Sequence, residues 1–232
     1  NWKVMALIWA VIPIINGIAF TRVPIASLIE DGESGMTINE LCMNKTFWIL
    51  MLMMLCAGAS EQGVSQWAST FAEQGLGVSK VVGDLAGPMA FAVLMGSART
   101  FYGKWGDRID LDRFMIGSSL LCILSYLCIS LAPSAFVSLI GCSVCGFSVG
   151  IMWPGSFSKA SSALRNGGTS LFALLALAGD VGCSGGPTLV GFVSSLASDD
   201  LKRGILVGVI FPMFLLVGIL LLRKKNTKGN VC

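Results

Sequence analysis

The chain carries seven apolar runs, each close to the length that a helix needs to cross a bilayer. They cover residues 2–20, 46–72, 81–98, 114–132, 135–152, 169–193 and 204–222. About 20 helical residues cross the ~30 Å hydrocarbon core. Alternating segments of ~10 residues, which are typical of barrel strands, do not occur. Because a backbone in lipid must satisfy its own hydrogen bonds, the runs predict helices. The fold class is therefore an all-α membrane protein with about seven transmembrane helices.

Composition agrees with this fold class. Hydrophobic residues make up 54% of the chain and charged residues 12%, and the mean hydropathy is +0.78. Soluble domains carry about 25% charged residues. We therefore expect the lipid bilayer as a partner. The net charge of +3 reflects basic residues in the predicted loops, and the sequence shows no basic surface with aromatic side chains. Nucleic acid is therefore not an expected partner.

The basic residues predict an orientation. If the tail "RKKNTKGNVC" faces the cytoplasm, twelve of the 16 basic residues lie on that side. The four on the other side are Lys3, Lys80, Lys202 and Arg203. This is a positive-inside bias. We expect a multi-pass protein of the plasma membrane with a cytoplasmic C-terminus.

The order of polar and apolar segments predicts four parts. The chain begins "NWKV", without an initiator Met or a signal peptide, so we expect a fragment whose first helix ends a preceding set. Residues 1–20 would be that helix, 21–45 a cytoplasmic loop, 46–223 a six-helix bundle and 224–232 a cytoplasmic tail. Within the loop, Ile25, Leu28 and Ile29 at helical spacing predict a short interfacial helix.

The second apolar run contains the polar stretch "ASEQGVSQW". An acid at the centre of a membrane helix costs ~2.5–3.5 kcal/mol on the insertion scale, and Glu61 falls only a little past the predicted midplane. Helical spacing gathers the polar side chains into a stripe. The stripe comprises Glu61, Gln62, Ser65, Gln66, Ala68 and Ser69. It should face a cavity or another helix, whereas Trp67 either stacks on a ligand or belongs to the aromatic belt.

A second buried acid, Asp180, lies midway along "LALAGDVGCSGGP". Intramembrane ionisable residues mark functional sites by default. We therefore expect at least one of Glu61 and Asp180 to act in coupling or in substrate binding. The alternative is an acid that is satisfied by a neighbouring helix.

Glycines and prolines recur inside the runs. "GFSVG" and "GILVG" match the small-xxx-small pattern of closely packed helices, and "GDVGCSGGP" is also rich in small residues. Pro88, Pro154, Pro187 and Pro212 lie in or at the ends of runs and should kink or break them.

A charged loop, "GSARTFYGKWGDRIDLDRF", separates two runs. Its part "GKWGDRIDLDR" resembles the signature loop of the major facilitator superfamily, a Gly, an acid, a base and further basic residues. Gly103, Asp107, Arg108 and Arg113 match the signature. The sequence departs from it in two places, since Asp110 and Asp112 stand where the family has a Gly and a base.

The resemblance implies a gate in this loop. In the family, the loop's acid and bases are thought to make charge contacts that favour one access state. Asp107 and Arg108 would be the gate pair, with Arg99 at the helix end as a possible partner. The alternative is a merely solvated, positive-inside loop.

The resemblance covers nearly the whole chain and implies helices six to twelve of a twelve-helix fold. The expected architecture is the C-terminal six-helix bundle plus the preceding helix, and the expected partner is the missing N-terminal half. "GASEQGVSQW", "GIMWPGSFSKA" and "GGTSLFALLALAGDVGCSGGP" look like bacterial permeases of the sugar or fucose-permease-like kind. By this analogy the cavity residues are Glu61, Gln62, Gln66, Trp153 and Asp180.

The function that follows is secondary active transport of a small polar solute by alternating access. Symport with a proton, or with another cation, would drive it. Sugars fit the amides and Trp67, whereas an anion would need a midplane Arg or Lys, and the sequence places none there. The chain has no His and no P-loop Ser or Thr after "YGK", so we expect no metal, no cofactor and no ATP hydrolysis.

Two alternatives belong to other classes. A non-transporting sensor or scaffold could use the same fold. An intramembrane aspartyl protease would need two facing acids, and "LAGD" at Asp180 lacks the first Gly of that family's motif. The sequence therefore favours a transporter over an enzyme.

Overall fold

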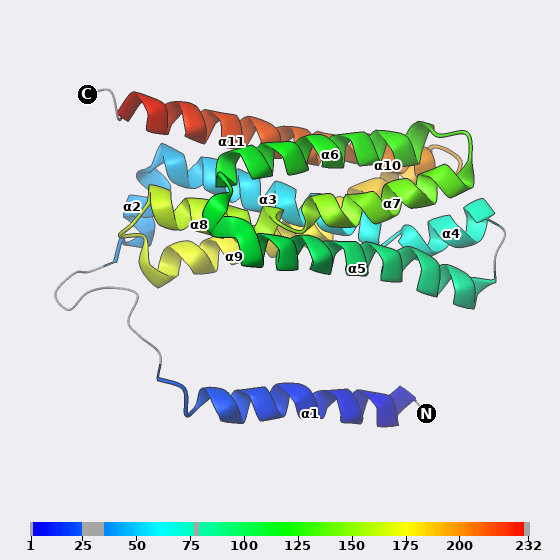
Figure 1. Ribbon diagram of the computed structural model, residues 1–232, viewed down its shortest axis with the longest axis horizontal. Coiled ribbons are helices and arrows are strands. Elements are labelled where there is room, and N and C mark those ends of the chain that lie inside the picture. Colours follow the sequence, from blue (N-terminus) through cyan, green and yellow to red (C-terminus); the bar gives the residue numbers. More distant parts are fainter. Residues whose placement is uncertain (1, 25–34, 77–78, 230–232) are drawn as a thin grey trace. The chain divides into compact units, whose positions relative to one another are not determined.

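The structure is a computed structural model that describes residues 2–24, 35–76 and 79–229. The chain forms two compact units, Asn1–Ser34 and Gly35–Cys232. All regular structure in the described ranges is helical (Figure 1). The predicted all-α fold class is confirmed.

The first unit contains one helix, α1 (Trp2–Phe20), which includes Pro13. Most of its side chains are exposed, as expected for an apolar membrane helix that is considered apart from the second unit. The interfacial helix predicted around Ile25, Leu28 and Ile29 lies outside the described residues.

The second unit is built from ten α-helices and a short 3-10 turn within the described ranges. They are α2 (Ile38–Met43), α3 (Lys45–Ser65), α4 (Ala68–Leu76), α5 (Lys80–Trp105), the 3-10 turn η1 (Gly106–Arg108), α6 (Leu111–Leu131), α7 (Ala135–Val149), α8 (Met152–Ala163), α9 (Gly168–Leu196), α10 (Leu201–Gly208) and α11 (Ile210–Gly229). Sequence analysis missed α2, which a capping box between Thr37 and Glu40 starts.

Six helical segments of the described chain are long and apolar enough to cross a membrane. They are Lys3–Phe20, Lys45–Glu73, Leu111–Leu131, Phe136–Ala163, Gly168–Leu196 and Leu201–Lys224. Three of them consist of two successive helices: α3 with α4, α7 with α8, and α10 with α11. The remaining predicted run, 81–98, lies within α5, whose 26 residues extend about 39 Å. All seven predicted runs thus lie in single helices or in pairs of successive helices, and six of them are long and apolar enough to cross a membrane.

Helix α3 is the central helix of the second unit. It packs against α9, α11, α8 and α7, and most of its residues are buried. Gly58, Gly182 and Gly186 allow α3 and α9 to approach closely. A Cβ atom on Gly58 would overlap the carbonyl oxygen of Gly179, and one on Gly182 would overlap that of Leu55. The small residues of "GDVGCSGGP" therefore serve helix packing, as predicted.

The other glycine patterns also lie at contacts. Gly146 of α7 meets the Phe91 backbone of α5, and Gly204 of α10 meets the Val190 backbone of α9.

The four prolines singled out in the sequence behave in two ways. Helices α5 and α9 continue through Pro88 and Pro187. Pro154 and Pro212 are instead the third residues of α8 and α11, immediately after helix breaks, where proline is tolerated.

The packing predicts different effects of two alanine substitutions on α9 on the stability of the bundle. Gly182→Ala should lower the stability of the bundle by about 1–3 kcal/mol, because the new methyl group forces α3 and α9 apart. Gly185→Ala is the matched control, since a Cβ there meets nothing within 4 Å. It should be neutral or gain up to ~1 kcal/mol from helix propensity. Thermal unfolding in detergent checks both, and equal losses would contradict the close approach.

Candidate functional site

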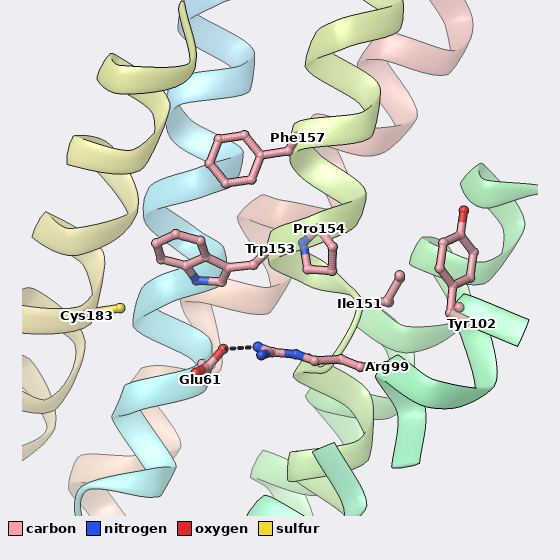
Figure 2. Close-up of a pocket in the computed structure, with 9 residues that line it drawn as sticks. Glu61, Arg99, Tyr102, Ile151, Trp153, Pro154, Phe157 and Cys183 are labelled. Atoms are coloured by element: carbon pink, nitrogen blue, oxygen red, sulfur yellow. Dashed lines mark ion pairs between the residues drawn. The ribbon is translucent and has the colours of Figure 1, made fainter. Parts of the chain in front are cut away.

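Four helices of the second unit surround a pocket of about 640 Å³ (Figure 2). Its volume falls in the ~300–1,000 Å³ range of small-molecule sites. The lining comes from α3, from α5, from α8 with the residue before it, and from α9. The lining residues are Glu61, Arg99, Tyr102, Gly103, Ile151, Trp153, Pro154, Phe157 and Cys183.

The pocket contains an ion pair between α3 and α5. The Arg99 Nη2 atom lies 3.5 Å from the Glu61 Oε2 atom, and the two side chains are 45% and 14% exposed. Figure 2 shows the guanidinium and the carboxylate pointing toward each other. Glu61 Oε2 accepts no hydrogen bond from the described residues, so the contact is an ion pair without hydrogen-bond geometry.

A helix break holds Arg99 in place. Pro154 has no N–H group, so the carbonyl of Gly150 lacks the partner that a continuous helix would supply. The Arg99 Nε atom donates to this carbonyl at 3.2 Å. Gly150 also leaves room for α5, because a Cβ there would lie 2.9 Å from the Met95 oxygen. The sequence "GIMWP" thus creates an acceptor that orients the guanidinium toward Glu61.

Trp153 adds an unused donor to the pocket. Its Nε1 atom is buried and has no hydrogen-bond partner in the described part of the chain. In Figure 2 this nitrogen lies on the edge of the ring that faces Glu61. Phe157 lies one helical turn further along, with its ring centroid 6.1 Å from that of Trp153. The pocket therefore has a polar end and an aromatic wall.

The predicted amides lie in a different place. Gln66 and Trp67 line a smaller hollow of about 330 Å³ with Thr70, Pro187 and Thr188. The Gln66 amide donates to the Gln62 oxygen at 3.2 Å. Trp67 lies in the break between α3 and α4 and donates through Nε1 to the Pro187 oxygen at 3.2 Å. Here Trp67 fixes α3 against α9.

Asp180 is exposed on α9 and lines a third hollow of about 480 Å³. Ser184 and Thr188 follow it at helical spacing, and Thr188 also lines the hollow of Gln66 and Trp67. Of the predicted cavity residues, the structure brings only Glu61 and Trp153 into one pocket. The polar stripe is divided because α9 lies against α3.

The predicted loop residues separate as well. Arg99 and Gly103 line the main pocket. The side chain of Asp107 lies outside the described part, and Arg108 is exposed in the 3-10 turn. The Arg113 backbone N–H donates to Asp110 at 2.9 Å, which caps α6. This bond holds the pKa of the Asp110 carboxyl below its ordinary value.

Sequence analysis missed two ionic contacts. The sequence analysis placed no Arg or Lys at the midplane for an anion to bind, but α5 continues past the predicted end of its apolar run and carries Arg99 to Glu61. The second contact joins Asp112 at the start of α6 to Lys159 of α8, whose side chain is only 7% exposed. Asp112 is one of the two positions at which the loop departs from the family signature, and its carboxylate pairs with Lys159.

The fold and the site define a class, namely a multi-helix membrane protein with an ion pair in a pocket of solute size. A family model described as Major Facilitator Superfamily matches residues 1–187. This match covers most of the chain, so the chain belongs to the Major Facilitator Superfamily and is a membrane transporter of that type. Comparisons with curated proteins and with solved structures gave no match.

The Asp112 and Lys159 pair gives a stability prediction. Removing one partner of a buried pair leaves an uncompensated charge and costs on the order of 3 kcal/mol. Asp112→Asn should cost more than Lys159→Met, because Lys159 is the more deeply buried partner. The double variant should recover part of the loss. Unfolding midpoints in detergent measure these effects.

The control for this prediction is Arg203→Met. Arg203 pairs with Asp200 at the surface, where the side chains are 70% and 40% exposed, and exposed pairs contribute only ~0–1 kcal/mol. Similar losses for this control and for Asp112→Asn would contradict a buried structural pair.

Proposed function

We propose that this chain forms the solute-handling bundle of a proton-coupled secondary transporter. The transported solute would be a sugar or another small organic molecule, moved by alternating access. The observation that supports this proposal is the ion pair between Glu61 and Arg99 in a pocket of about 640 Å³. Ionisable groups are costly inside a membrane and commonly mark ion and substrate pathways.

The proposed coupling step is protonation of Glu61. In the ionised state, the carboxylate attracts the guanidinium and ties α3 to α5. A proton on Glu61 removes one of the two charges, and with it most of the attraction. Arg99 then keeps its bond to the Gly150 carbonyl but loses its anionic partner. The proton thereby shifts the balance between arrangements of α3, α5 and α8.

Two further parts of the proposal come from the charge pattern. We place the C-terminus in the cytoplasm and the protein in the plasma membrane, following the positive-inside bias. The turn between α5 and α6, with Asp107, Arg108 and Arg113, is the proposed gate. Asp180, exposed on α9, is the second candidate for coupling.

The coupling role predicts a specific defect in the full-length transporter. Glu61→Gln should abolish solute uptake driven by a proton gradient, because the amide cannot exchange a proton. Exchange of labelled for unlabelled solute without a gradient should persist, since the pocket keeps its shape. Both are measured in proteoliposomes with a panel of sugars and organic acids.

Glu73→Gln provides the control, because Glu73 is an exposed glutamate on α4. It should leave gradient-driven uptake near the wild-type rate. Uptake by Glu61→Gln that still rises with the proton gradient would refute the proposed role of Glu61.

A further inference from the structure

Resting on the proposed function, we propose that the solute is a small organic monocarboxylate with a compact apolar or aromatic body. Its carboxylate would replace that of Glu61 beside Arg99, and the Trp153 N–H group would donate to it. One proton, carried on Glu61, would accompany each solute anion.

The state of Arg99 supports an anionic ligand. A guanidinium has five N–H donors in a planar fork that suits a carboxylate. Nε is used on the Gly150 carbonyl, and the Nη2 atom has only the 3.5 Å ion pair with Glu61. The side chain is also 45% exposed. Arg99 is therefore positioned by the protein but has unused donors that face the pocket.

Trp153 supplies a second donor from another helix. Its buried N–H group has no partner among the described residues and lies on the ring edge toward Glu61 (Figure 2). Leaving a buried donor unsatisfied costs ~1–3 kcal/mol. A carboxylate between Arg99 and Trp153 would satisfy this donor and add a charge-assisted hydrogen bond.

The rest of the lining suits an apolar body better than a sugar. Ile151, Pro154 and Phe157 offer no side-chain donor or acceptor, and Phe157 extends the aromatic wall that Trp153 begins. Tyr102 adds one hydroxyl group to this lining. A sugar needs a partner for each buried hydroxyl group, because an unmatched polar group is penalised. The amides that favoured a sugar, Gln62 and Gln66, bond to each other elsewhere.

Charge balance makes the proton necessary. The charged, titratable and hydrogen-bonding side chains that line the pocket with Glu61 are Arg99 and Tyr102 from α5, Trp153 from α8 and Cys183 from α9. Arg99 is the only cation among these lining residues. An anionic solute beside ionised Glu61 would place two carboxylates against one guanidinium. When Glu61 is protonated and a solute carboxylate is bound, the pocket is neutral. It is also neutral without solute, when ionised Glu61 pairs with Arg99.

The test measures ligand binding to the purified full-length transporter by thermal shift and titration. The probes are butyrate, benzoate and phenylacetate, each paired with its neutral amide, together with glucose and fucose. At least one acid should bind well, its amide at least about tenfold more weakly, and the sugars least. Affinity for the acid should rise as the pH is lowered, because protonation of Glu61 removes the competing carboxylate.

Three variants make this test sharp. Glu61→Gln should bind the acid about tenfold more tightly at neutral pH and lose the pH dependence, a gain that misfolding cannot imitate. Arg99→Gln should abolish binding. Trp153→Phe should weaken it about five- to tenfold, because the ring stays and one hydrogen bond is lost. Arg203→Gln is the matched control, because Arg203 belongs to an exposed pair outside the pocket, and it should bind like the wild type.

Several outcomes would overturn the inference. These are equal binding of acid and amide, binding of no acid in the panel, retained binding by Arg99→Gln, or weaker binding by Glu61→Gln. Gradient-driven uptake of a sugar without acid binding would refute this substrate class and leave proton-coupled transport standing. Acid binding with the expected variant pattern, but without gradient-driven uptake, would refute the coupled transport and leave the carboxylate site standing.

Discussion

The site depends on a backbone carbonyl that proline has left without a helical partner. Pro154 cannot donate to Gly150, and the Arg99 Nε atom takes that place. An unpaired carbonyl would be costly in a membrane helix, so the proline and the arginine support each other. Once Nε is fixed, the remaining guanidinium atoms are directed to Glu61. The position of Arg99, the only cation among the described residues that line the pocket, thus follows from the break between α7 and α8.

Close packing of α3 and α9 decides which acid takes part in the site. Gly58 and Gly182 bring the two backbones together without intervening side chains. This contact leaves Cys183 at the edge of the main pocket and Asp180 in another hollow. The two intramembrane acids therefore have different surroundings, since Glu61 has a cationic partner and Asp180 is exposed. Of the two acids, Glu61 is the one that the structure pairs with a cation in the main pocket.

Much of the fold was predictable because it follows from local rules. Apolar length gave the helices, and glycine spacing gave the close contacts at Gly146 and Gly204. The site was only partly predictable. Glu61 stood out because an acid in an apolar run is expensive, but its partner lies on another helix, and pairing between helices depends on their tilt and register. Lys159 was counted only among the twelve basic residues of the cytoplasmic side, although its side chain is buried against Asp112.

Helix α8 connects the main pocket to the ion pair between Lys159 and Asp112. Trp153 places its donor in the pocket, and Lys159, six residues later, holds Asp112 of α6. These residues lie about 9 Å apart along the helix axis, so one rigid segment joins the pocket to the start of α6. The break at Gly150 leaves α8 attached to α7 by a short irregular link. A change at the pocket that displaces α8 must therefore strain or carry with it the contact at Asp112. That contact lies beside the turn that bears the family signature, so α8 provides a physical connection between the pocket and the proposed gate.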